Sequence, residues 1–143
     1  MIRVFLDTNV LIDVLLHREP FLNDSAQVLN MGFQGKVELY ATPLSFATCV
    51  FVTRKSLGYN NSIEALKIFE QHIHITSMDA AQLHKALYAV APDFEDMLQY
   101  HAAAAAECNY IVTRNEKHFP QGTIAVMSPT AFLQTALLWT AWL

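Results

Sequence analysis

Charged residues are scarce in this chain, and the scarcity narrows the classes of protein to which it can belong. Only 15% of the 143 residues are Asp, Glu, Lys or Arg, whereas 53% are hydrophobic. Such a composition indicates a well-buried globular protein and excludes a disordered one. The nine Lys and Arg residues are outnumbered by thirteen acids, so the formal net charge is −4. A basic surface that coats nucleic acid is therefore not expected, although bound divalent cations could still bring positive charge to a phosphate.

Cysteine is equally scarce. The two cysteines, Cys49 and Cys108, lie in apolar or alanine-rich surroundings and form no CxxC motif. Buried free thiols are the favoured interpretation, which fits a reducing cytosol, and one disulfide is the alternative.

Secretory and membrane-spanning segments are not expected either. The N-terminal "MIRVFLDTN" has one basic residue and reaches an acid at Asp7, which is unlike a signal peptide. The apolar C-terminal "TAFLQTALLWTAWL" is shorter than the about 20 residues that span a bilayer and is interrupted by Gln134. We therefore expect a soluble, cytoplasmic protein. Trp139 and Trp142 predict core packing at this end, with a docking or dimer surface as the alternative.

The length fits one domain, residues 1–143, with no internal repeat or linker. Short apolar segments alternate with longer segments of helical pattern. Strands are expected at 2–6, 36–42, 73–76, 110–113 and 123–127, and helices at 9–17, 23–32, 43–58, 60–72, 80–90, 92–109 and 128–137. Strands that are apolar throughout predict a parallel sheet covered on both faces. The expected fold is α/β, a three-layer α/β/α sandwich around a parallel sheet of about five strands.

Polar residues gather where these strands and helices meet. Asp7 follows the first strand, Asp93 and Asp96 open the helix before the fourth strand, and Thr113–Glu116 follow that strand. Ligands of such sheets bind outside the carboxyl ends of the strands, so these groups are expected to converge. Taken singly, Asp7 and Asp93 are better explained as helix N-caps. Their joint placement favours a functional site.

Several chemistries lack their motifs. GxGxxG and GxxxxGK[ST] are absent, which disfavours dinucleotide and P-loop sites, and no GxSxG elbow is present. HExxH and a Cys/His quartet are also missing, and His72 and His74 make a weak zinc pair. The oxygen donors of Asp7, Asp96 and Asn115 suit Mg²⁺ or Mn²⁺ instead.

Three segments carry a resemblance to a known family. "FLDTNVLIDVLLHREPF", "PDFEDMLQYHAAAAAECNYIVTRNEKHF" and "VMSP" occur in the order and at the distances typical of PIN domains. The sequence resembles the compact bacterial form, often found as toxin ribonucleases, over roughly residues 3–133. The resemblance implies a Rossmann-like fold whose acidic pocket binds one or two Mg²⁺ or Mn²⁺ ions and hydrolyses RNA phosphodiester bonds.

The resemblance also implies roles for single residues. Asp7 matches the first acidic metal ligand and Asp96 the third, and Asn115 stands at a fourth position where many members have aspartate. These three form the expected catalytic set, with Asp7 and Asp96 as the metal ligands. The expected supporting residues are Asn9, Thr113, Glu116 and Asp93. Asn9 is expected to hydrogen-bond within the pocket.

The chain departs from the family pattern at the second acid. The segment "PLSFATCVFVTRK" contains no acid, and Thr48 stands at that place. Asp7 and Asp96 alone carry a formal charge of −2, so we expect one metal site at most before substrate binds.

The leading hypothesis is a metal-dependent endoribonuclease, acting as the toxin of a toxin–antitoxin pair, with RNA as substrate, an antitoxin as partner and a homodimer as the expected assembly. Candidate phosphate contacts are Arg18, Arg54, Lys55, Arg114 and Lys117. The alternative is a PIN-fold protein that binds RNA or protein with reduced or lost catalysis, because the second acid is missing. Phosphoryl transfer through Asp7, as in haloacid-dehalogenase-like enzymes, ranks low because Asn9 replaces the second aspartate that such enzymes need.

Overall fold

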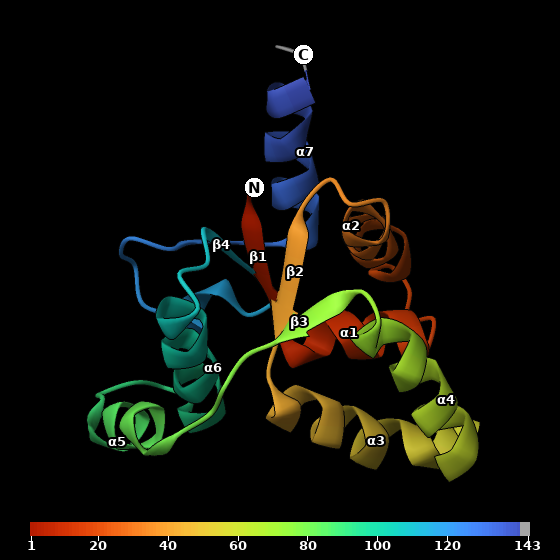
Figure 1. The fold of residues 1–143 in the computed structure, drawn as a ribbon, viewed down its shortest axis with the longest axis horizontal. Coiled ribbons are helices and arrows are strands. Elements are labelled where there is room, and N and C mark those ends of the chain that lie inside the picture. Colours follow the sequence, from red (N-terminus) through yellow and green to blue (C-terminus); the bar gives the residue numbers. More distant parts are fainter. Residues whose placement is uncertain (141–143) are drawn as a thin grey trace.

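The computed structural model describes residues 1–140, which form a central sheet flanked by helices (Figure 1). The elements in chain order are β1 (Arg3–Leu6), α1 (Thr8–Leu15), α2 (Leu22–Phe33), β2 (Glu38–Ala41), α3 (Pro43–Leu57), α4 (Tyr59–Glu70), β3 (Ile73–Ile75), α5 (Ala80–Tyr88), α6 (Phe94–Ala105), β4 (Tyr110–Val112), the short 3₁₀ turn η1 (Glu116–His118), β5 (Ala125–Met127) and α7 (Pro129–Thr140). All five predicted strands and all seven predicted helices are present, and the α/β class is confirmed.

The sheet is parallel throughout, and its strand order is β3-β2-β1-β4-β5. The central strand β1 pairs with β2 on one side and with β4 on the other; Phe5 lies opposite Tyr40 and Ile111. The chain builds the sheet outward from β1 through β2 and β3 and then returns to add β4 and β5 on the other edge of β1. The strand order therefore reverses between β1 and β4. In open α/β sheets this reversal opens the crevice in which ligands bind.

Two apolar cores explain why the strands are buried on both faces. Val4 and Leu6 of β1 face a core shared with α1, α2, α3, α4 and α7, whereas Phe5 faces a second core with α6. Figure 1 shows α5 and α6 on one side of the sheet and α1 to α4 on the other. Ala102 and Ala103 are fully buried in the second core, where their small side chains let α6 pack closely.

A residue with a side-chain oxygen directly follows each strand. These residues are Asp7, Thr42, Thr76, Thr113 and Ser128. Three of them cap the next helix: Asp7 accepts from the backbone N–H of Thr8, Thr42 from Ser45, and Ser128 from Ala131. The carboxyl end of the sheet is therefore lined with short polar side chains on fixed backbone.

The two cysteines lie in the apolar cores. Cys49 and Cys108 are free and buried, as predicted, and burial raises the pKa of each thiol to about 12.

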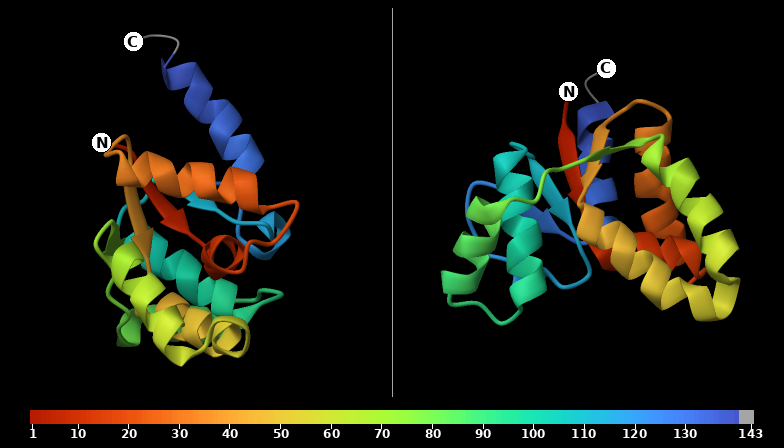
Figure 2. Two further views of the ribbon diagram at one scale, coloured as in Figure 1. Left: turned by 90° about the vertical axis from the view of Figure 1, so that its right-hand side faces the viewer. Right: turned by 60° about the horizontal axis from the view of Figure 1, so that its bottom comes forward.

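Trp139 packs against Tyr110 and Phe132, whereas Trp142 lies outside the described residues. The helix α7 extends beyond the rest of the fold (Figure 2), and its Leu138 is 66% exposed. Within residues 1–140, no helix has both the length and the apolar character needed to cross a bilayer.

Candidate active site

Asp7 is a buried carboxylate at the point where the strand order reverses. Only 3% of the residue is exposed. Its Oδ1 accepts hydrogen bonds from the backbone N–H of Thr8 at 2.7 Å and from Gln99 Nε2 at 2.9 Å, and its Oδ2 accepts from Thr113 Oγ1 at 2.7 Å. The donors come from α1, α6 and the residue after β4. The side chain is therefore held in one orientation by three separate segments of the chain.

A line of neutral polar groups extends from Asp7 into the protein. Thr8 Oγ1 donates to Ser45 Oγ at 2.8 Å, and Ser45 Oγ lies at 3.5 Å from Gln99 Oε1, a long hydrogen bond. The amide nitrogen of Gln99 in turn donates to Asp7. Thr42 Oγ1 also contacts Ser45 Oγ, at 3.1 Å. This network fixes the amide of Gln99 so that its N–H groups, and not its oxygen, face the carboxylate.

Asp96 forms a second buried carboxylate at the first turn of α6. Its Oδ2 lies 2.9 Å from His118 Nδ1, and its backbone N–H donates to Asp93 Oδ1, which caps the helix, at 2.9 Å. One ligand atom from each of Asp93, Asp96 and His118 lies within 4.8 Å of the others. Two carboxylates and one imidazole thus form a compact group of metal-ligand type beside Asp7.

Burial and mutual repulsion raise the pKa of Asp7 and of Asp96. Burial raises the pKa of Asp7, and the hydrogen bonds from Thr113, Gln99 and Thr8 oppose that rise. Burial, followed by the charge of Asp7, raises the pKa of Asp96 to about 6, and the hydrogen bond with His118 opposes the rise. The charge of Asp93 raises the pKa of both groups. The three carboxylates therefore belong to one electrostatic pocket, which a cation would stabilise.

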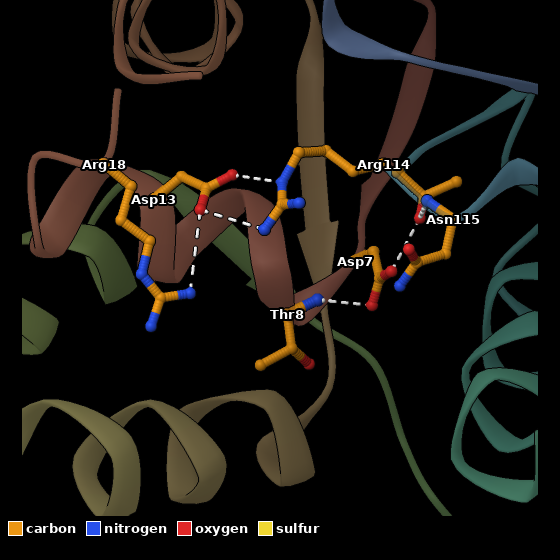
Figure 3. A network of polar contacts seen from close by, with 7 residues as sticks. Asp7, Thr8, Asp13, Arg18, Arg114 and Asn115 are labelled. Atoms are coloured by element: carbon orange, nitrogen blue, oxygen red, sulfur yellow. Dashed lines mark hydrogen bonds and ion pairs between the residues drawn. The ribbon is translucent and has the colours of Figure 1, made fainter. Parts of the chain in front are cut away.

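The other expected residues surround this pocket in different ways. Thr113 contacts Asp7 directly, as above, and accepts from the backbone N–H of Asn115 at 2.9 Å. Asn115 is exposed, and Figure 3 shows its side chain on the Asp7 side of the loop. Its backbone φ of −117° lies outside the left-handed region. Asn9 Oδ1 is buried and has no hydrogen-bond partner among the described residues, and Glu116 is exposed at the start of η1.

Arg114, which was expected to contact a phosphate, is turned away from Asp7 and paired with Asp13. Its Nε lies 2.6 Å from Asp13 Oδ2 and its Nη2 lies 3.2 Å from Asp13 Oδ1 (Figure 3). Arg18 Nη1 lies 3.9 Å from the same carboxylate, so it too is turned toward Asp13. Asp13 is fully buried, and burying a carboxylate without such partners would be costly. Of the five candidate phosphate contacts, Arg18, Arg54, Lys55 and Lys117 are exposed, and Arg114 is half-buried.

The absent second acid of α3 has no carboxylate substitute on that helix. Thr48 Oγ1 instead lies 3.4 Å from Glu95 Oε1 of α6, at an exposed position. Glu95 and Asp96 diverge as the helical spacing predicts, because Asp96 is buried and Glu95 is exposed.

Sequence reasoning missed four residues of this region: Gln99, Ser45, His118 and Asp13. Gln99 had a usable signal, since it lies three positions after Asp96 and so shares its helix face. Asp13 also had one, because a lone acid within the apolar "NVLIDVLL" needs a partner. Ser45 and His118 carry no signal that separates them from ordinary surface or helix residues.

Comparison with known proteins identifies the fold and the family. The family model described as "PIN domain" matches residues 3–117, most of the chain. The chain belongs to the PIN domain family. This PIN domain is 25% identical over 137 residues to "Ribonuclease VapC1" of Aquifex aeolicus (strain VF5), which covers 92% of this chain and 94% of the relative.

Solved structures agree with that assignment at the level of the fold. VapBC-1 from nontypeable Haemophilus influenzae matches this PIN domain with a TM-score of 0.64 at 15% identity, over 90% of this chain and 99% of that one. A toxin–antitoxin complex from Klebsiella pneumoniae matches with a TM-score of 0.64 at 18% identity, over 88% and 97% of the two chains.

The raised pKa of Asp96 predicts how stability depends on pH. In the unfolded chain the pKa of an aspartate is about 3.9, so between about pH 4 and pH 6 the folded protein binds more protons and loses stability as the pH rises. Asp96→Asn cannot ionise. We expect the variant to be more stable than the wild type at pH 7 by about 1–3 kcal/mol, and equally stable near pH 4. Urea denaturation at both pH values measures the difference.

The neighbouring Glu95→Gln is the matched control, because Glu95 is exposed on the same helical turn. It is expected to change the free energy of unfolding by the same small amount at both pH values. If Asp96→Asn increases the free energy of unfolding equally at pH 7 and near pH 4, the electrostatic explanation is contradicted.

Proposed function

We propose that this PIN domain is an endoribonuclease that depends on Mg²⁺ or Mn²⁺ and acts as the toxin of a toxin–antitoxin pair. The observation that carries the proposal is the pocket at the strand reversal, where Asp7 and Asp96 are buried and repel one another. Buried acids that repel one another are characteristic of functional sites. The relative named as a ribonuclease spans nearly the whole chain and supports the same activity.

The donor set fits a divalent cation. Asp7, Asp96 and Asp93 provide carboxylate oxygens and His118 provides an imidazole nitrogen, all ligand types that Mn²⁺ accepts, while Mg²⁺ takes the oxygens. Asp7 accepts three protein hydrogen bonds and has room for one more partner among its roughly four lone-pair directions. A bound cation at such a site polarises a phosphate oxygen and makes water a stronger nucleophile at neutral pH.

Other side chains of the protein orient Asp7 and contact the substrate. Thr113 and Gln99 hold Asp7 in one orientation, so its remaining acceptor position is fixed before any ligand binds. Asn115, fixed through its backbone N–H to Thr113, directs water or phosphate with its uncharged amide. Exposed Lys117, two positions further along the loop, contacts an RNA phosphate.

Arg54 and Lys55 extend the proposed RNA contact along α3. Both are exposed in the last turns of that helix, and the Arg54 guanidinium lies 5.0 Å from the ring centre of Phe51. Phe51 is 66% exposed, so its ring is available to an unpaired base. Because these contacts are few and the net charge is −4, the RNA is held mainly at the pocket.

The expected partners follow from the same relatives. The Haemophilus influenzae and Klebsiella pneumoniae structures are described as VapBC and as a toxin–antitoxin complex. By analogy, we propose that an antitoxin binds this chain in the cytoplasm. We also propose a homodimer, which the descriptions of these relatives do not mention. Exposed apolar side chains such as Leu138 on α7 provide surface for one of these contacts.

A PIN-fold binding protein without catalysis is the second candidate. The observation that favours it is Thr48, which stands where the family usually has an acid and makes only a long contact to exposed Glu95. Under this reading the pocket holds too little negative charge for a catalytic ion.

RNA cleavage tests the choice between the two functions. We expect the wild type to cut single-stranded or structured RNA with Mg²⁺ or Mn²⁺. Asp7→Asn and Asp96→Asn should each lower the rate by about 100-fold or more, because each removes a charge that binds the ion. The matched control is Glu64→Gln, which removes a carboxylate from an exposed ion pair on α4 and should cut like the wild type. Cleavage that survives the combined Asp7→Asn and Asp96→Asn substitutions sinks the assignment, and a metal-binding wild type that cuts no RNA favours the binding protein.

His118 should set the preference among cations. Imidazole nitrogen is a good ligand for transition metals and a poor one for Mg²⁺, so His118→Ala should weaken Mn²⁺ binding on the order of 10-fold and leave Mg²⁺ binding nearly unchanged. Calorimetric titration of the RNA-free protein with each ion measures both affinities. His84→Ala, on the exposed face of α5, is the control. Equal weakening of both ions would show that His118 only positions Asp96.

A further inference from the structure

Arg114 lies between two residues of the acidic pocket, but its own side chain leaves that pocket. Thr113 Oγ1 bonds to Asp7 and to the backbone N–H of Asn115, so the backbone of Arg114 is fixed at the edge of the pocket. Figure 3 shows the guanidinium directed toward α1 and away from Asp7. Carboxylates therefore lie on both sides of the loop that carries Arg114: Asp7 on one side and Asp13 on the other. Only Asp13 binds the guanidinium.

Asp13 is the carboxylate that binds it. The two parallel hydrogen bonds, Nε to Oδ2 at 2.6 Å and Nη2 to Oδ1 at 3.2 Å, fix the plane of the guanidinium. The ring of Phe21 lies against the same group, with its centre 4.0 Å from the central guanidinium carbon. Asp13 is fully buried, and a quarter of the Arg114 side chain is exposed. The orientation of Arg114 is therefore strongly restrained.

A guanidinium turned toward the pocket would compete with a divalent cation for the carboxylates. Asp93 and Asp96 lie together beside the buried Asp7, so three carboxylates share this pocket and repel one another. A guanidinium turned toward them would relieve this repulsion, because arginine pairs well with carboxylates. It would then occupy the oxygens that a divalent cation needs and would repel the cation directly.

We propose that Asp13 is a positioning residue, which holds the guanidinium of Arg114 out of the acidic pocket so that Asp7 and Asp96 stay available to a divalent cation. The inference rests on the metal site of the proposed function. Asp13 touches neither the cation nor the RNA in this role; it acts through Arg114. The pair thus keeps a positive charge close to the pocket without neutralising it.

The test compares the Mn²⁺ affinity of three RNA-free proteins by calorimetry. Asp13→Asn releases Arg114 and should weaken Mn²⁺ binding on the order of 10–100-fold, the range found when a group that supports a metal site is lost. Adding Arg114→Gln to that variant removes the released charge and should restore most of the lost affinity. The recovery is the deciding result, since the double variant still lacks the Asp13–Arg114 contact.

Two results overturn the proposal. If the double variant binds Mn²⁺ as weakly as Asp13→Asn, the contact between Asp13 and Arg114 has only a structural role. If Asp13→Asn binds like the wild type, Arg114 does not enter the pocket. Glu38→Gln is the matched control: it removes the carboxylate that lies 3.7 Å from Arg3, at the other end of the sheet, and should leave Mn²⁺ affinity unchanged.

Phe21→Ala keeps the test decisive if Asp13→Asn does not fold. It removes one restraint on the guanidinium and leaves the buried ion pair in place, so Mn²⁺ affinity should fall, by less than for Asp13→Asn, and recover with Arg114→Gln. An unchanged affinity in Phe21→Ala then counts against the proposal. Wild-type protein that binds no Mn²⁺ overturns the metal site and this inference together, whereas Mn²⁺ binding without RNA cleavage overturns only the proposed nuclease.

Discussion

The burial of one carboxylate organises the rest of this structure. Asp7 ends the central strand, where water is excluded, and an unpaired charge there would be costly. Its oxygens are satisfied by Thr8, Gln99 and Thr113, which come from three segments far apart in the sequence. Each donor is fixed in turn, Gln99 through Ser45 and Thr113 through the backbone of Asn115. The requirement to solvate Asp7 thus fixes the positions of α6 and of the loop after β4.

The same constraint separates the charges around the pocket. Asp96 and Asp93 add negative charge beside Asp7, and the nearest arginine of the β4 loop is bound by Asp13 on the opposite side. The protein therefore concentrates carboxylates at one point and keeps the guanidinium groups of Arg18 and Arg114 on another carboxylate, Asp13. Such an arrangement costs stability in the free protein, as expected of a binding site and not of a structural ion-pair network. Binding of a cation, as proposed, would restore that stability. The family and the ribonuclease relative agree with this interpretation.

Local sequence signals were sufficient for the fold and for part of the site. Apolar segments such as "IRVFL", separated by cap residues, predicted every strand and helix, and the positions of Asp7, Asp96 and Thr113 at their ends predicted a common location. The strand order was beyond the sequence, because it depends on how helices pack against both sides of β1. The partners of buried groups could not be predicted from the sequence either. The pairing of Arg114 with Asp13 and the contact of His118 with Asp96 depend on the directions of side chains that are far apart in the sequence.

A crystal structure of the protein grown with Mn²⁺ tests the central claim most directly, because anomalous scattering locates the ion without reference to activity. The account predicts an anomalous peak at the carboxyl end of β1, within coordination distance of Asp7 and Asp96, with Thr113 and Gln99 still bonded to Asp7 and the guanidinium of Arg114 still on Asp13. Ordered Mn²⁺ bound elsewhere on the protein, with the oxygens of Asp7 and Asp96 occupied only by protein groups, would contradict it.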